Sequence, residues 1–227
     1  MRNAETAVHS HHRKAIDAAV DHFAAEGSVR ALLLGGSIAH GFERADSDVD
    51  LLIVVSDEEH DVRRREGRLR FATSEGCDWP GGYVEGKYLS PGFLATVAER
   101  GTEPARFAFQ DARVLFSRLD GLDVLLRAIV RYPVEAKAER IRRFYAQFEA
   151  WHWYAHEALR REDAYLRGIA VAKTVLFGAR MILAHNELLY PYHEWLLRLL
   201  EAAPERTGTR PTLRGMGVSG FVGGDPG

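Results

Sequence analysis

Apolar and polar positions follow two different periods in the first 120 residues. Ala15, Ala18, Ala19 and Phe23 recur near the helical period, which predicts an amphipathic helix over about residues 7–26. Short apolar runs bounded by glycine and polar residues then predict strands, at 29–37, 48–55, 68–73, 81–90 and 112–118. Residues 91–101 begin with proline and end with glycine, as helices often do. This part is predicted to be mixed α/β.

The pattern changes at about Gly121, after which the helical period dominates and strand-like runs are almost lacking. Apolar residues step by three and four to form one stripe along a long helix, at Ile141, Phe144, Phe148, Trp151, Ala155 and Leu159. Further helices are predicted over 164–186 and after Pro191. The second part is therefore predicted to be an all-α helical bundle.

These patterns predict three regions: an α/β domain with a mixed sheet over residues 1–120, a helical bundle domain over 121–204 and a glycine-rich tail over 205–227. The tail has little apolar periodicity, so we expect it to be disordered. The overall fold class expected is α+β (α/β).

Composition and charge narrow the classes of function. The chain has 227 residues, 46% of them hydrophobic, and a formal net charge of −2, so no overall positive field favours nucleic-acid binding. Its single cysteine, Cys77, fits a reducing compartment. We see no secretory signal and no convincing membrane span, and we expect a cytoplasmic protein. The sequence neither indicates nor excludes a homodimer.

Two neighbouring predicted strands bring together glycine, serine and aspartate. Gly35, Gly36 and Ser37 end one strand, and Asp48 and Asp50 open the next. Positions two apart on a strand share a face, so the two carboxylates lie side by side and repel each other unless a cation intervenes. Mg²⁺ is commonly held by carboxylates together with substrate phosphates, and glycine backbone can approach a phosphate closely. The alternative is a plain acidic turn beside a tight glycine turn.

This arrangement resembles the signature of the DNA polymerase β-like nucleotidyltransferase superfamily, in particular its minimal and aminoglycoside-type members. The matching residues are Leu34 to Ser37, followed by Asp48, Val49, Asp50 and Leu51. The resemblance implies transfer of a nucleoside monophosphate from an NTP, here expected to be ATP, to a hydroxyl. It also implies Mg²⁺, or Mn²⁺ in its place, held by three catalytic carboxylates.

We assign the third carboxylate to Glu85, in a strand-like run where other charges are scarce. Family members often have aspartate there. Lys87 is two residues on, shares the face of Glu85 and is expected to reach a phosphate. Glu85 would then be a metal ligand or the general base, two roles that the sequence does not separate. The alternatives are an exposed polar face of an edge strand, or Asp78 as the third carboxylate.

Basic residues in the predicted bundle offer a second nucleotide contact. Lys173 and Arg180 are seven residues apart and so lie on one face of a helix. We expect them to contact nucleotide phosphate; the alternative is that both extend from the margin of an apolar face into water.

The acceptor hydroxyl belongs either to a small molecule resembling an aminoglycoside or to a protein. A non-catalytic nucleotide-binding protein, or an antitoxin-like interaction protein, is the alternative outside enzymes. His9, His11 and His12 form a short run that favours an exposed polar helix face over a metal site.

Overall fold

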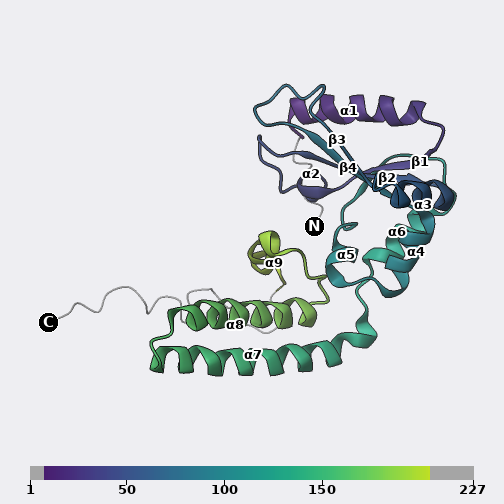
Figure 1. Cartoon of the computed structure of the whole chain (residues 1–227). Coiled ribbons are helices and arrows are strands. Elements are labelled where there is room, and N and C mark those ends of the chain that lie inside the picture. Colours follow the sequence, from purple (N-terminus) through teal and green to yellow (C-terminus); the bar gives the residue numbers. More distant parts are fainter. Residues whose placement is uncertain (1–7, 205–227) are drawn as a thin grey trace. The chain divides into compact units, whose positions relative to one another are not determined.

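The computed structural model describes residues 8–204, which form two compact units (Figure 1). The first unit contains residues 8–132 and 189–192, and the second contains 133–188 and 193–204. The units therefore part after Tyr132 rather than at Gly121. The predicted tail, 205–227, lies outside the described residues.

The first unit alternates helices with strands. Its elements, in chain order, are α1 (Ser10–Ala25), β1 (Val29–Leu34), α2 (Gly36–His40), β2 (Val49–Val55), α3 (Asp57–Arg65), β3 (Arg70–Thr73), β4 (Val84–Leu89), α4 (Pro91–Arg100), α5 (Glu103–Phe107), β5 (Arg113–Ser117) and α6 (Leu122–Val130). The strands predicted from the apolar runs are all present.

Within residues 8–204, five strands form one mixed sheet in the order β3-β4-β2-β1-β5. Strand β1 pairs antiparallel with β2 and with β5, and β3 pairs antiparallel with β4. Strands β2 and β4 are parallel, with the crossover from one to the other carrying α3 and β3. The mixed α/β prediction is confirmed for this unit.

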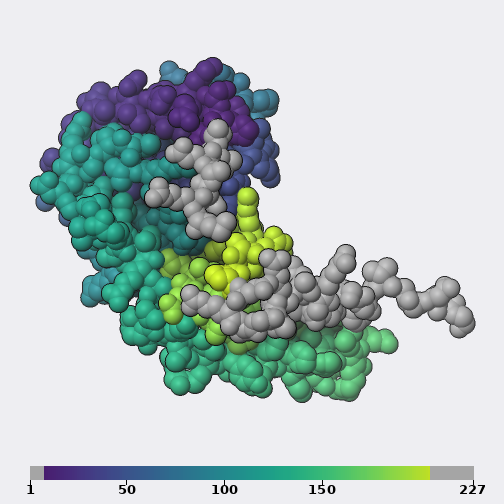
Figure 2. Space-filling model, turned by 180° about the vertical axis from the view of Figure 1, so that it is seen from behind, coloured from purple at the N-terminus to yellow at the C-terminus, as the bar shows by residue number. Residues whose placement is uncertain are grey.

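Helix α1 packs on one face of the sheet. Its buried Ala15, Ile16, Ala19 and Phe23 share a core with alternate residues of β1 and β2. On these strands the residues that face α1 are Leu32, Leu34, Val49, Leu51, Ile53 and Val55. The opposite side of the helix is exposed and forms part of the purple surface in Figure 2. Ala18, predicted on the apolar side, is exposed.

Helices α4 and α6 pack on the other face. Leu94 and Val97 of α4, with Leu122 and Ile129 of α6, share a second core with Ala31, Leu33, Val54 and Leu89. Val54 and Leu89 lie near the carboxyl ends of β2 and β4. The amino-terminal ends of these two strands, on the same face, carry polar residues instead.

The second unit is helical, as the stripe of apolar residues predicted. It contains η1 (Val134–Ala136), α7 (Lys137–Arg160), α8 (Ala164–His185), η2 (His193–Trp195) and α9 (Leu196–Ala202). Helices α7 and α8 lie side by side (Figure 1), and Gly178 of α8 lies against the ring of Phe148. Phe144 is buried, whereas Leu159 at the end of the stripe is exposed. Of the helices in residues 8–204, none has the length and apolar character needed to cross a membrane.

Candidate active site

The parallel pairing of β2 and β4 brings acidic residues from distant parts of the sequence together. Asp50 and Glu85 are directly opposite each other in the register of the two strands. Asp48 lies two residues before Asp50, and Lys87 two residues after Glu85, so all four share one face of the sheet. This is the face opposite α1. The structure thus brings the three predicted catalytic carboxylates to one end of one face.

Asp50 lies at the centre of this group and is largely buried. Burial raises its pKa to about 6, and the negative charges of Asp48 and Glu85 add to the increase. Lys87 and His40 act in the opposite direction. Burial and the two neighbouring carboxylates both make the ionised form of Asp50 unfavourable, and a bound cation would offset this cost.

The glycine segment lies against the Asp50 carboxylate. The Gly35 N–H donates a hydrogen bond to the Asp50 carbonyl oxygen at 2.9 Å. Gly36 has a φ of +60°, and a Cβ on it would lie 1.7 Å from Asp50 Oδ2. Only glycine fits there, both for its conformation and for its lack of a side chain. Strand β1 ends at Leu34, so Gly36 and Ser37 begin the short helix α2 instead of extending the strand as predicted.

Ser37 follows Gly36 and places a hydroxyl beside the same group. Its Oγ is buried and has no hydrogen-bond partner among the described residues. A buried hydroxyl without a partner is costly, so a ligand oxygen would satisfy it. Together, the glycine close approach and this hydroxyl fit the phosphate contact predicted for residues 35–37.

Two of the three carboxylates have partners within the protein. Tyr83 donates a hydrogen bond to Asp48, and this bond raises the pKa of the tyrosine to about 12, with the Asp48 charge adding to it. The phenol is therefore a neutral donor at neutral pH. Glu85 pairs with Arg70 of β3 at 3.1 Å. Asp78, the alternative third carboxylate, pairs instead with Lys14 of α1 at 3.2 Å.

These carboxylates are suited to a hard divalent cation. In this structure, however, Asp48 and Glu85 direct oxygens toward Tyr83 and Arg70 instead. Within residues 8–204, no three His, Cys, Asp or Glu side chains are arranged to hold a metal ion. Carboxylate oxygens are nevertheless the ligands that Mg²⁺ and Mn²⁺ prefer, commonly with substrate phosphates completing the coordination. The raised pKa of Asp50 and the unpartnered Ser37 Oγ fit this combination of metal and phosphate.

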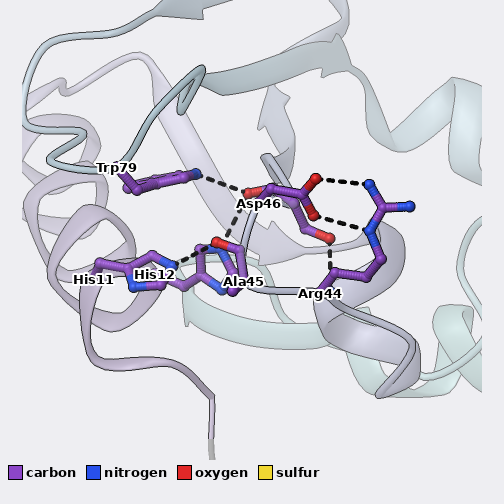
Figure 3. Close-up of polar contacts among 7 residues, drawn as sticks. His11, His12, Arg44, Ala45, Asp46 and Trp79 are labelled. Carbon is purple, nitrogen blue, oxygen red and sulfur yellow. Dashed lines mark hydrogen bonds and ion pairs between the residues drawn. The ribbon is translucent and has the colours of Figure 1, made fainter.

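The loop that leads into Asp48 is held by hydrogen bonds (Figure 3). Arg44 pairs with Asp46 at 2.8 Å through both Nε and Nη2, and its backbone N–H donates to Ser47 Oγ at 2.9 Å. Helix α1 contributes His11, whose Nε2 lies 2.9 Å from the Ala45 carbonyl oxygen.

His12 and Trp79 bind the same carbonyl group in this loop. His12 Nε2 lies 3.0 Å from the Ser47 carbonyl oxygen, and Trp79 Nε1 donates to that oxygen at 3.2 Å. Because a carbonyl only accepts, His12 carries its hydrogen on Nε2. Burial and the neighbouring His11 lower the pKa of His12, so it is neutral at neutral pH.

The prediction of an exposed histidine face was wrong for His12, which is fully buried. The sequence contains the signal: His12, Ala15, Ile16, Ala19 and Phe23 step by three and four, so His12 extends the apolar face of α1.

His40 is a further buried polar residue that the sequence analysis did not identify. Its ring stacks on Phe107 with centroids 4.7 Å apart, and its Nδ1 lies 3.1 Å from Asp111 Oδ2. Its charge also affects Asp50. Its ring also stacks on Phe42, two residues on, but the contacts with Phe107 and Asp111 come from about 70 residues later in the chain and are not predictable from a local pattern.

Lys173 and Arg180 lie on α8 in the second unit. Lys173 is exposed, and the Arg180 guanidinium lies 4.1 Å from the centroid of the Phe144 ring. Part of this arginine therefore packs within the helical unit. Their contact with nucleotide stays a prediction.

Comparison with known proteins places this site within a described domain. Residues 14–101 match the family model of the nucleotidyltransferase domain. A solved structure described as a nucleotidyltransferase-like protein from Exiguobacterium sibiricum aligns with 84% of this chain, at 13% identity and a TM-score of 0.46. The chain spans 62% of that protein. No curated protein matches the chain.

The matched segment runs from α1 to the end of α4 and contains Gly35, Gly36, Ser37, Asp48, Asp50, Glu85 and Lys87. The resemblance drawn from residues 34–51 is thereby confirmed. The chain contains a nucleotidyltransferase domain of the polymerase β-like type over residues 14–101.

Proposed function

We propose that this protein is a metal-dependent nucleotidyltransferase that moves a nucleoside monophosphate from an NTP to an acceptor hydroxyl and releases pyrophosphate. The expected nucleotide is ATP with Mg²⁺, or Mn²⁺ in its place. The acceptor is a small molecule resembling an aminoglycoside or a hydroxyl of a protein. The supporting observation is the alignment of Asp50 with Glu85 across β2 and β4, with Asp48 on the same face.

The residues of the site divide between the metal and the phosphates. Asp48, Asp50 and Glu85 would hold divalent ions, which neutralise the triphosphate and lower the pKa of the acceptor hydroxyl. Ser37 would donate its unpartnered hydroxyl to a phosphate oxygen, and Gly36 leaves room for that oxygen beside Asp50. Lys87, which is exposed on the same face, would pair with another phosphate oxygen.

The proton of the acceptor hydroxyl needs a base. Glu85 is the candidate for this role because it lies beside Asp50 and is partly exposed, while Asp48 already accepts a hydrogen bond from Tyr83. Arg70 would have to release Glu85 for either the basic or the metal-binding role. Since Arg70 is largely exposed, the cost of breaking this pair is small.

The alternative is a non-catalytic protein that binds nucleotide, or an antitoxin-like interaction protein. The Arg70–Glu85 ion pair favours it, because a permanently paired Glu85 would leave two carboxylates where the family uses three. The raised pKa of Asp50 favours the enzyme, because Glu85 is close enough to contribute to it.

Calorimetry with a non-hydrolysable ATP analogue, with and without Mg²⁺, tests the nucleotide site. We expect binding that Mg²⁺ strengthens in the wild-type protein and that Asp48→Asn with Asp50→Asn abolishes. Glu75→Gln, which removes an exposed carboxylate in a turn of the same unit, is the matched control and should bind like wild type. Equal binding by the double variant and the control would contradict the assignment.

Transfer itself is measured with α-labelled NTPs and candidate acceptors, aminoglycosides and small helical proteins among them. Label on an acceptor with pyrophosphate release, lost in Glu85→Gln, supports the enzyme. Binding without transfer to any acceptor, unchanged in Glu85→Gln, supports the non-catalytic alternative.

A further inference from the structure

The Ser47 carbonyl oxygen receives two side-chain donors that come from different parts of the chain. His12 Nε2 of α1 lies 3.0 Å from it, and Trp79 Nε1, from the segment between β3 and β4, lies 3.2 Å from it. Two donors fill both lone pairs of a carbonyl oxygen. The peptide group that joins Ser47 to Asp48 is therefore fixed in direction.

Both donors are themselves rigid. His12 is fully buried and Trp79 is 8% exposed. Their rings pack edge to face with centroids 5.1 Å apart, and Gly82 is so close to the indole that a Cβ there would lie 2.4 Å from it. A donor that cannot move restricts the group it binds more strongly than an exposed one.

The other side of Asp48 is fixed by the sheet. The Val49 N–H donates to the Tyr83 carbonyl oxygen at 3.1 Å, which begins the pairing of β2 with β4. Asp48 thus stands between a carbonyl held by His12 and Trp79 and an amide held by Tyr83, the residue before β4. Neither donor touches the carboxylates directly.

Packing alone does not account for a histidine at position 12. His12 Nδ1 is buried with no hydrogen-bond partner among residues 8–204, which costs free energy that an apolar side chain would not. A buried polar ring at such a cost is explained by the bond that its other nitrogen makes.

We propose that His12 and Trp79 are positioning residues that direct Asp48 toward the metal and nucleotide by holding the Ser47 carbonyl. This inference rests on the proposed function. The two residues are outer-shell supports of a metal ligand, and loss of such supports typically weakens metal affinity by about 10- to 100-fold.

The test compares His12→Phe, His12→Gln and Trp79→Phe in the full-length protein. The phenylalanine variants retain a ring but remove the N–H donor, whereas the glutamine amide can still donate to Ser47. His22→Phe is the matched control, because His22 lies on the same helix but pairs with Glu26, away from the loop. The readout is the ratio of the Kd values for the ATP analogue without and with Mg²⁺, together with Tm.

We expect this ratio to fall by about tenfold in His12→Phe and in Trp79→Phe, and to recover in His12→Gln, while binding without metal stays unchanged. The control should keep the wild-type ratio. A merely structural role would lower Tm without changing the ratio in the folded protein. If His12→Phe does not fold, Trp79→Phe still tests the proposal.

The outcomes separate the two proposals. A wild-type ratio retained in folded Trp79→Phe or His12→Phe overturns the positioning role and leaves the nucleotidyltransferase proposal standing. A wild-type protein whose nucleotide binding does not respond to Mg²⁺ or Mn²⁺ overturns the proposed function, and the positioning role with it.

Discussion

The two faces of strand β2 differ in chemistry although their residues alternate along one short segment. On the face toward α1, Leu51 and Ile53 are completely or almost completely buried in an apolar core. On the opposite face, Asp50 is largely buried as well, and this burial raises its pKa, with the charges of Asp48 and Glu85 adding to the increase. Neighbouring residues therefore have opposite effects on stability at neutral pH: Leu51 and Ile53 stabilise the fold, whereas ionised Asp50 destabilises it.

The largest change in the free energy of unfolding is expected from a substitution on the apolar face of β2. Leu51→Ala removes a side chain that is 1% exposed and leaves a cavity between the sheet and α1. The free energy of unfolding should fall by about 2–5 kcal/mol. Urea denaturation measures it, and a loss below about 1 kcal/mol would show that α1 closes over the vacated space.

Substitution of the adjacent residue, Asp50, should instead raise the free energy of unfolding. The pKa of Asp50 rises from its usual 3.8 to about 6 on folding, so the protonated form is favoured in the folded state. Its ionisation therefore costs stability as the pH rises through about 6, and nothing below about pH 4. Asp50→Asn removes that cost and should stabilise the protein on the order of 2–3 kcal/mol at pH 7–8.

Thermal unfolding of Asp50→Asn and wild type from pH 4 to pH 8 checks this prediction. The difference in Tm should be near zero at pH 4 and grow up to about pH 7. A difference independent of pH would mean that Asp50 is not the titrating group. Glu75→Gln, with an exposed carboxylate, should show no such trend.

The smallest change in the free energy of unfolding is expected from loss of the Arg70–Glu85 ion pair, at the edge of the same site. Arg70→Ala removes the ion pair with Glu85, in which the arginine side chain is 77% exposed. Exposed pairs contribute little, so the free energy of unfolding should change by less than about 1 kcal/mol. Nucleotide binding should instead depend more strongly on Mg²⁺, because Glu85 is released. Calorimetry that shows a weaker dependence would assign Arg70 to the nucleotide rather than to Glu85.

Much of this site follows from strand periodicity alone. The period of two places Asp48 and Asp50 on one face, and likewise Glu85 and Lys87, before any pairing is known. The stripe on α7 follows from the helical period in the same way. These features depend only on residues close together in the sequence.

What the sequence could not provide depends on contacts over long separations. Nothing local specifies that β4 lies parallel to β2 with Glu85 opposite Asp50, because β3 and α3 intervene. The environment of His40 depends on Asp111, and the bond from Trp79 to Ser47 spans 32 residues. The burial of His12, by contrast, was available from the helical period.

The parallel register of β2 and β4 links assembly of the site to folding of the core. A slip of β4 by one residue would turn Glu85 toward the apolar residues under α1 and bring Gly86 beside Asp50, because neighbouring residues face opposite sides. Such a misaligned chain would lose core packing and the alignment of Glu85 with Asp50 in the same step. Molecules that fold with an intact core therefore also place Glu85 opposite Asp50, so a measurement that reports correct packing under α1 also reports correct assembly of this carboxylate pair.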